Sequence, residues 1–141
     1  MSREAYLIDA VRTPIGRGKS DGWLHGIHPV DLLAMTLDEV TRRAGCPKEA
    51  VDDVVAGCVT PAGDQASDVG RLATLKAGFP IDVPGVQINR FCGSGQQAIH
   101  FAAAGHPLGR HGYRHRLRRG EHEPGSHVQR RTVQSGVYRR F

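Results

Sequence analysis

Residues 86–98 read Val-Gln-Ile-Asn-Arg-Phe-Cys-Gly-Ser-Gly-Gln-Gln-Ala. The first four of them predict a short strand, and residues 94–104, rich in Ala and Gln, predict a helix. Gly93 and Gly95 permit a tight turn between the two, because glycine accepts backbone conformations that other residues avoid. A strand, a turn and a helix in this order predict one unit of a parallel sheet.

The residues before this unit alternate between strand and helix in the same way. Residues 5–11 and 51–59 are short apolar runs and predict strands. Apolar residues recur at helical spacing after Pro29 and again after residue 68, and both patterns end at glycine and proline. Asp68 or Ser67 is the expected N-cap of the second helix. The order βαβαβα predicts an α/β domain over residues 1–105, with a mostly parallel sheet covered by helices.

Cys92 lies at the carboxyl end of the third predicted strand, where α/β sheets place their chemistry. A cysteine before a helix faces unpaired N–H groups and the positive end of the helix dipole, which both favour a thiolate. The thiolate is the nucleophilic form, and nearby N–H groups could stabilise an oxyanion. The alternative is a buried cysteine that packs as a small apolar side chain. We expect that packing role for Cys46 and Cys58.

Three segments of residues 1–105 resemble the thiolase family. Residues 89–98 are similar to the family's active-site pattern N-x-x-C-G-S-G, and residues 9–16 (Asp-Ala-Val-Arg-Thr-Pro-Ile-Gly) to D-A-x-R-T-P-x-G. Residues 54–59 fit the pattern of the family's second strand. Related ketoacyl synthases share the fold and the cysteine, but the segment at residues 9–16 points away from them.

The resemblance implies an acyl-CoA acyltransferase, either acetyl-CoA acetyltransferase or 3-ketoacyl-CoA thiolase, with a place in fatty acid metabolism. Cys92 would be the nucleophile and would carry the acyl group as a thioester. Gly93, Ser94 and Gly95 would form the supporting turn and supply oxyanion N–H groups. A Claisen condensation or the reverse thiolysis would follow. A coenzyme A thioester would be the substrate, with no bound cofactor and no metal.

Further expectations concern partners and location. The resemblance implies that the intact family member is a dimer or tetramer. It also implies a catalytic histidine and a second cysteine in a C-terminal half that this chain does not match, so we expect the chain alone to be inactive. Three cysteines without metal or disulfide spacing indicate a reducing compartment. With no apolar run long enough for a membrane span and no signal core, we expect a cytoplasmic protein.

Residues 106–141 differ in composition from the rest. They hold nine of the 19 Lys and Arg residues, two of the 14 Asp and Glu residues and five of the eight histidines. So polar a segment predicts a disordered basic tail. Its arginines could contact the phosphates of nucleic acid, but it has no lysine, few aromatic residues and no recognition motif, so binding of nucleic acid is not expected.

A shifted reading frame accounts for the composition of residues 106–141 better than nucleic-acid binding does. Back-translated with degenerate codons and read one base later, residues 106–127 are compatible with I-L-S-G-D-M-D-I-V-I-A-C-G-V-E-S-M-S-R-V-P-M. That peptide resembles the continuation of a thiolase. The hypothesis is therefore a one-base slip near Gly105. Two alternatives are a genuine but catalytically dead fragment, and a basic-tailed nucleic-acid-binding protein on an α/β scaffold.

Overall fold

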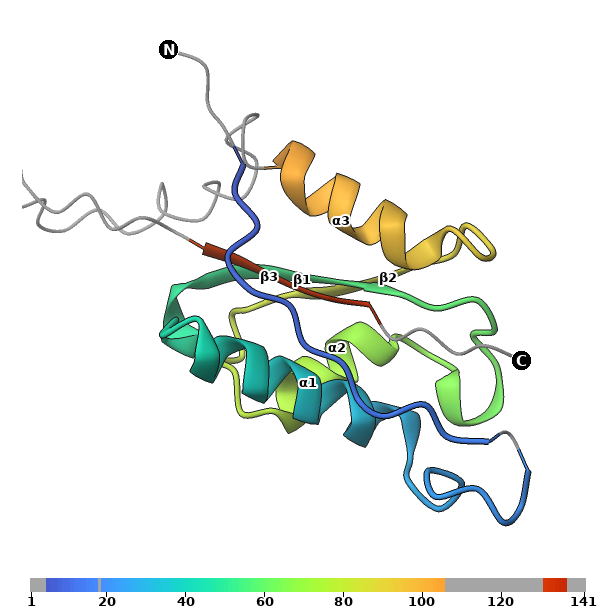
Figure 1. The fold of residues 1–141 in the computed structure, drawn as a ribbon. Coiled ribbons are helices and arrows are strands. Elements are labelled where there is room, and N and C mark those ends of the chain that lie inside the picture. The colour runs from blue at the N-terminus through green and yellow to red at the C-terminus, as the bar shows by residue number, and fades with distance from the viewer. Residues whose placement is uncertain (1–4, 18, 106–130, 137–141) are drawn as a thin grey trace, which may run out of the picture.

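The computed structural model describes residues 5–17, 19–105 and 131–136 (Figure 1). Its elements follow one another in the order α1 (Pro29–Arg43), the short 3-10 helix η1 (Lys48–Ala50), β1 (Val51–Gly57), the short 3-10 helix η2 (Gly63–Gln65), α2 (Val69–Lys76), β2 (Gly85–Ile88), α3 (Ser94–Gly105) and β3 (Arg131–Gly136). Strands alternate with helices, so the predicted α/β class is confirmed.

The three strands form one parallel sheet in the order β2-β1-β3. The central strand β1 pairs with β2 from Val54 to Gly57, and with β3 along most of its length. Figure 1 shows α3 on one face of the sheet, and α1 and α2 on the other. Since all strands run the same way, their carboxyl ends meet at one edge of the sheet, and the turn into α3 starts there.

Side chains of β1 divide the core between the two faces. Val54 and Ala56 belong to the larger cluster with α1 and α2, whereas Val55 packs with Ala98 and Ala102 of α3. This alternation follows from the period of two residues in a strand. Gly57 lies two residues after Val55 and therefore faces α3 as well.

The helix ends follow local signals in the sequence. Pro29 opens α1, and the Nδ1 atom of His28 accepts a hydrogen bond from the Val30 N–H at 3.2 Å. His28 is thus the N-cap of α1. Asp68 caps α2, as expected, by accepting a hydrogen bond from the Arg71 N–H at 3.0 Å.

The expected strand at residues 5–11 is not present, because these residues belong to no strand. Asp9 forms an ion pair with Arg43 at 3.0 Å, and Val11 packs against the larger core cluster. The two edges of β1 are already paired with β2 and β3, so residues 5–11 find no edge of β1 on which to add. Tyr6 and Leu7 are left exposed as a result.

Strand β3 was not expected, because it lies within residues 106–141, for which the composition predicted disorder. Thr132 and Val133, both β-branched, sit inside it, and the backbone of β1 offers the partner groups. The predicted disorder of the other residues of 106–141 concerns residues that lie outside those described. The domain boundary at residue 105 likewise stays a prediction.

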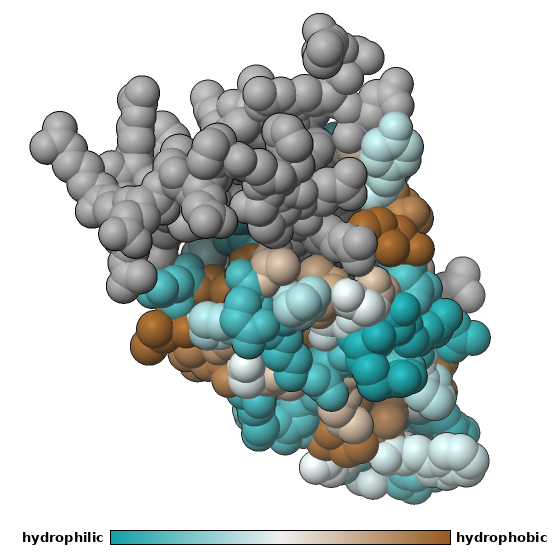
Figure 2. All heavy atoms as spheres, turned by 90° about the vertical axis from the view of Figure 1, so that its left-hand side faces the viewer, coloured by the Kyte–Doolittle hydropathy of each residue, from teal (hydrophilic) through white to brown (hydrophobic). Residues whose placement is uncertain are grey.

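Apolar side chains are common on the surface of the described residues. Trp23 is 90% exposed and Tyr6 78% exposed. Figure 2 shows hydrophobic and hydrophilic residues intermixed on one side of the molecule. None of the helices in the described part of the chain has the length and apolar character that crossing a bilayer requires.

Candidate active site

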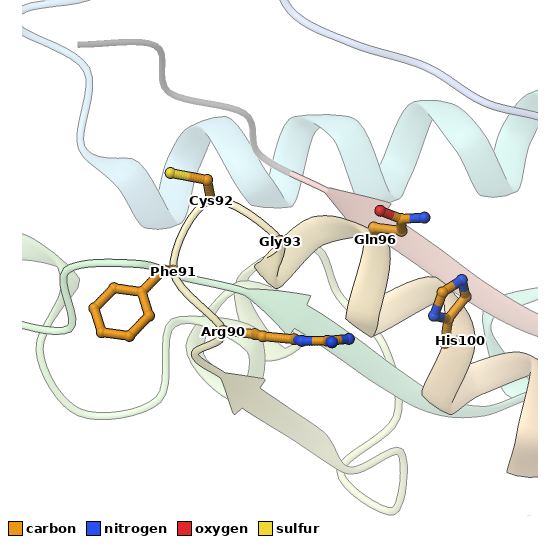
Figure 3. Close-up of a pocket in the computed structure, with 6 residues that line it drawn as sticks. All are labelled: Arg90, Phe91, Cys92, Gly93, Gln96 and His100. Atoms are coloured by element: carbon orange, nitrogen blue, oxygen red, sulfur yellow. The ribbon is translucent and has the colours of Figure 1, made fainter.

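The turn between β2 and α3 carries Cys92 at the surface. Strand β2 ends at Ile88, helix α3 begins at Ser94, and the Cys92 side chain is exposed between them. A cavity of about 580 Å³ lies against the turn and the first turns of the helix. It is lined by Arg90, Phe91, Cys92, Gly93, Gln96 and His100 (Figure 3). The thiol is therefore open to a reagent from solvent.

The backbone of the turn is closed by its own hydrogen bonds. The Gly93 N–H donates to the Arg90 carbonyl at 3.0 Å, and the Ser94 N–H donates to the Phe91 carbonyl at 3.0 Å. Two of the three N–H groups that we expected to serve an oxyanion thus already have acceptors, because they close the turn. The Gly95 N–H takes part in neither bond. An oxyanion role for these groups stays a prediction.

Gly57 allows the start of α3 to lie directly on β1. A Cβ atom at this position would come within 2.6 Å of both the Gly95 nitrogen and the Ser94 carbonyl carbon. Such contacts are shorter than any packed protein tolerates, so only glycine fits without a shift of backbone. The closeness of β1 to Ser94 fixes where the helix begins and, with it, where Cys92 is presented.

The other polar side chains of the cavity do not face the thiol. Figure 3 shows the Cys92 sulfur pointing away from α3, whereas Arg90, Gln96 and His100 extend along the helix side of the turn. Arg90 donates a hydrogen bond to Gln97. His100 is exposed at the cavity wall. None of the residues that line the cavity is placed to take a proton from Cys92.

The other two cysteines are buried, as their packing role requires. Cys58 donates a hydrogen bond from its thiol to the Gln65 Oε1 atom at 3.5 Å. Burial raises the pKa of the Cys58 thiol above its ordinary value, and a hydrogen bond at Thr60 only partly opposes this. Within the described residues no group of three or more His, Cys, Asp or Glu side chains could hold a metal ion.

We expect iodoacetamide to label Cys92 first when the protein is folded. Cys92 is exposed, whereas Cys46 and Cys58 are buried and become accessible to the reagent only when the protein unfolds locally. The raised pKa of Cys58 also reduces the fraction of its reactive thiolate. Time-resolved peptide mass spectrometry should show Cys92 modified at least about tenfold faster than the other two. Equal rates in the folded protein would contradict this placement of the three thiols, and equal rates in urea serve as the control.

The described residues form a parallel α/β domain with an exposed cysteine on a strand-to-helix turn. Residues 5–109 match the family model for the thiolase N-terminal domain, and the chain belongs to this family. The match ends shortly after the change of composition at Gly105.

Several curated thiolases are similar to this part of the chain. A steroid 3-ketoacyl-CoA thiolase of Mycobacterium tuberculosis is 54% identical over 100 residues, which are 71% of this chain and 24% of that protein. A beta-ketoadipyl-CoA thiolase of Escherichia coli is 47% identical over 102 residues, 72% of this chain and 25% of that protein. A 3-ketoacyl-CoA thiolase of Bacillus subtilis is 39% identical over 101 residues, 72% of this chain and 26% of that protein. The chain thus spans about a quarter of the length of these relatives.

Sequence reasoning located Cys92 and its glycines, but it treated Gly57 and Asn89 only as positions in motifs and gave neither a role in the site. Gly57 carried a readable signal, because a single glycine inside an apolar strand often marks a close backbone approach. Asn89 opens the N-x-x-C-G-S-G pattern, but its bonds to the Phe91 N–H and to the Val59 carbonyl depend on how the chain folds.

Proposed function

We propose that Cys92 accepts an acyl group from a coenzyme A thioester. Its thiolate attacks the thioester carbonyl, a new carbon–sulfur bond forms at Cys92, and the bond to coenzyme A breaks. The coenzyme A thiolate leaves and takes up a proton from solvent. The observation that carries the proposal is the exposed Cys92 thiol on the β2–α3 turn, inside the segment that matches the thiolase N-terminal domain.

The proposed substrates follow from the chain's membership of the thiolase family. Relatives are named as thiolases of 3-ketoacyl-CoA, steroid 3-ketoacyl-CoA and beta-ketoadipyl-CoA. The intact protein would condense two acyl-CoA molecules or cleave a 3-ketoacyl-CoA, with coenzyme A thioesters as substrates rather than as bound cofactors. It would act in the cytoplasm as a dimer or tetramer.

The described residues support only the first half of this reaction. Acyl transfer to Cys92 needs a nucleophile and an open approach, which the turn and the cavity supply. Carbon–carbon bond formation also needs a base, and no cavity residue is oriented to be one. We therefore propose that this chain alone acylates once and does not turn over.

Release of coenzyme A from acetyl-CoA tests the proposal. The wild-type chain is expected to release close to one equivalent in a single burst, with no steady-state phase, because Cys92 becomes blocked. Cys92→Ser should remove the burst, and Cys58→Ser should retain it. A burst that persists in Cys92→Ser, or that is absent from the wild type, would overturn the proposed function.

A second proposal concerns residues 106–141, where a one-base slip near Gly105 accounts for the tail. The shifted frame reads compatibly with a thiolase continuation over 22 consecutive codons, and the family match ends at residue 109. Nucleotide sequencing across codons 100–128 and beyond codon 141 is expected to find that continuation in the neighbouring frame. A neighbouring frame with early stop codons would refute the slip and would make the basic tail genuine.

A further inference from the structure

The backbone at Phe91 adopts a conformation that its side chain disfavours. Its φ is 47°, in the left-handed region, where a Cβ atom crowds the following carbonyl. A residue held there has to be held by its surroundings, because the relaxed chain would leave that region. Phe91 is also 78% exposed, so packing of its ring does not supply the restraint. The restraint must come from the polar groups of the turn.

Two side chains, those of Asn89 and Ser94, bond to the backbone N–H and carbonyl of Phe91. Asn89 Oδ1 accepts a hydrogen bond from the Phe91 N–H at 2.9 Å, and Asn89 Nδ2 donates to the Val59 carbonyl at 2.9 Å. The Asn89 side chain therefore ties the turn to the segment that follows β1.

Ser94 makes the matching bonds from the start of α3. Its Oγ donates to the Phe91 carbonyl at 2.6 Å and accepts from the Arg90 N–H at 2.9 Å. Ser94 is only 2% exposed. Loss of its hydroxyl would remove the acceptor of the Arg90 N–H, whereas the Phe91 carbonyl would keep its bond from the Ser94 N–H. Gly57 of β1 lies in close contact with the backbone of the same residue, Ser94. Ser94 thus connects the sheet, the helix and the strained turn.

We propose that Ser94 and Asn89 are positioning residues for Cys92. Their four hydrogen bonds hold Phe91 at positive φ, and this conformation sets where the adjacent Cys92 thiol lies relative to the N-terminus of α3. Neither side chain reacts. The inference rests on the proposed function, in which Cys92 is the reacting group, and it assigns to Ser94 a side-chain role separate from any oxyanion N–H.

Alkylation of Cys92 in the full chain tests this inference. Ser94→Ala is expected to slow labelling of Cys92 by iodoacetamide severalfold, because the turn no longer holds the thiol in one exposed position. Asn89→Ala should act in the same direction. Asn89→Asp, which retains the acceptor for the Phe91 N–H, should lose less.

A glycine at position 91 distinguishes a role of Ser94 in positioning Cys92 from a general role in stability. Because glycine adopts positive φ without a Cβ penalty, Phe91→Gly should recover most of the labelling rate lost in Ser94→Ala. Thr74→Val is the matched control. It removes a fully buried hydroxyl that donates to the Gly70 carbonyl at 2.8 Å in α2, far along the chain from the turn. It should lower stability and leave Cys92 labelling unchanged.

The outcomes are distinct. If Ser94→Ala and Asn89→Ala leave the rate of Cys92 labelling unchanged, or if Phe91→Gly restores none of the rate lost in Ser94→Ala, the inference is overturned. If Ser94→Ala fails to fold, labelling of Cys92 in Asn89→Ala tests the inference by itself. This variant should fold, because Asn89 is exposed and its truncation creates no cavity. If labelling responds as expected but acetyl-CoA never acylates wild-type Cys92, the inference stands and the proposed function fails.

Discussion

Gly57→Ala is expected to lower the free energy of unfolding by about 2–3 kcal/mol, because the new methyl group meets backbone rather than a flexible side chain. The nearest atoms would be the Gly95 nitrogen and the Ser94 carbonyl carbon, both at 2.6 Å, and the Ser94 oxygen at 2.7 Å. Relief requires the start of α3 to move off β1. The turn that carries Cys92 begins at this helix end, so labelling of Cys92 near neutral pH should fall together with stability.

Gly26→Ala is the control for this substitution. A Cβ atom at Gly26 would meet nothing within 4 Å, and its φ lies outside the left-handed region. Its unfolding free energy should stay within about 0.5 kcal/mol of wild type, as is usual for surface changes. Urea titration followed by circular dichroism measures both variants. Equal stabilities for the two alanine variants would mean that β1 and α3 are not in close contact.

Leu37→Ala should produce the largest loss of stability, about 3–4 kcal/mol. Leu37 is fully buried in α1, within the cluster that joins this helix to β1 and α2. Truncation removes apolar contacts and leaves a cavity that surrounding side chains fill only in part. The helix itself should tolerate the change, since alanine is the best helix former.

Leu72→Ala is the comparison on a second helix. Leu72 lies in α2 and is 42% exposed, so its truncation should cost less than half as much as that of Leu37. Chemical denaturation with a common slope would give both values. A larger loss at Leu72 than at Leu37 would show that the core does not lie between α1, α2 and β1.

The helices could be predicted from sequence because their signals are local. Pro29 begins α1, Asp68 caps α2, and α3 starts at Ser94, as the patterns indicated. Strand positions 51 to 57 and 85 to 88 also fell within a residue or two of the expected ranges. A hydrophobic run with flanking glycine and proline determines these elements without reference to distant residues.

Strand pairing was predicted less well, since it depends on partners that are far apart in the sequence. Residues 5–11 have the composition of a strand but form none, whereas Arg131–Gly136 pairs with β1 despite its polar surroundings in the sequence. Each edge of β1 pairs with one strand, and β-strand propensity alone does not predict which segment of the chain forms that pair.

The site could be predicted in its chemistry but not in its geometry. Cys92 and the adjacent glycines were readable because a nucleophile on a strand-to-helix turn has a recognisable pattern. The positive φ of Phe91 was not, because glycine or asparagine is the usual sign of that conformation. The bonds of Asn89 and Ser94 to the backbone likewise depend on how the turn folds.

Peptide-resolved mass spectrometry after incubation with acetyl-CoA tests the central claim most directly. The account predicts one acetyl group on the peptide that contains Cys92, removed by hydroxylamine as a thioester should be, and none on the peptides of Cys46 and Cys58. Unfolding in urea should abolish this selectivity, because it depends on the β2–α3 turn. An acetyl group distributed over all three cysteines of the folded protein, or none at Cys92, would contradict the account.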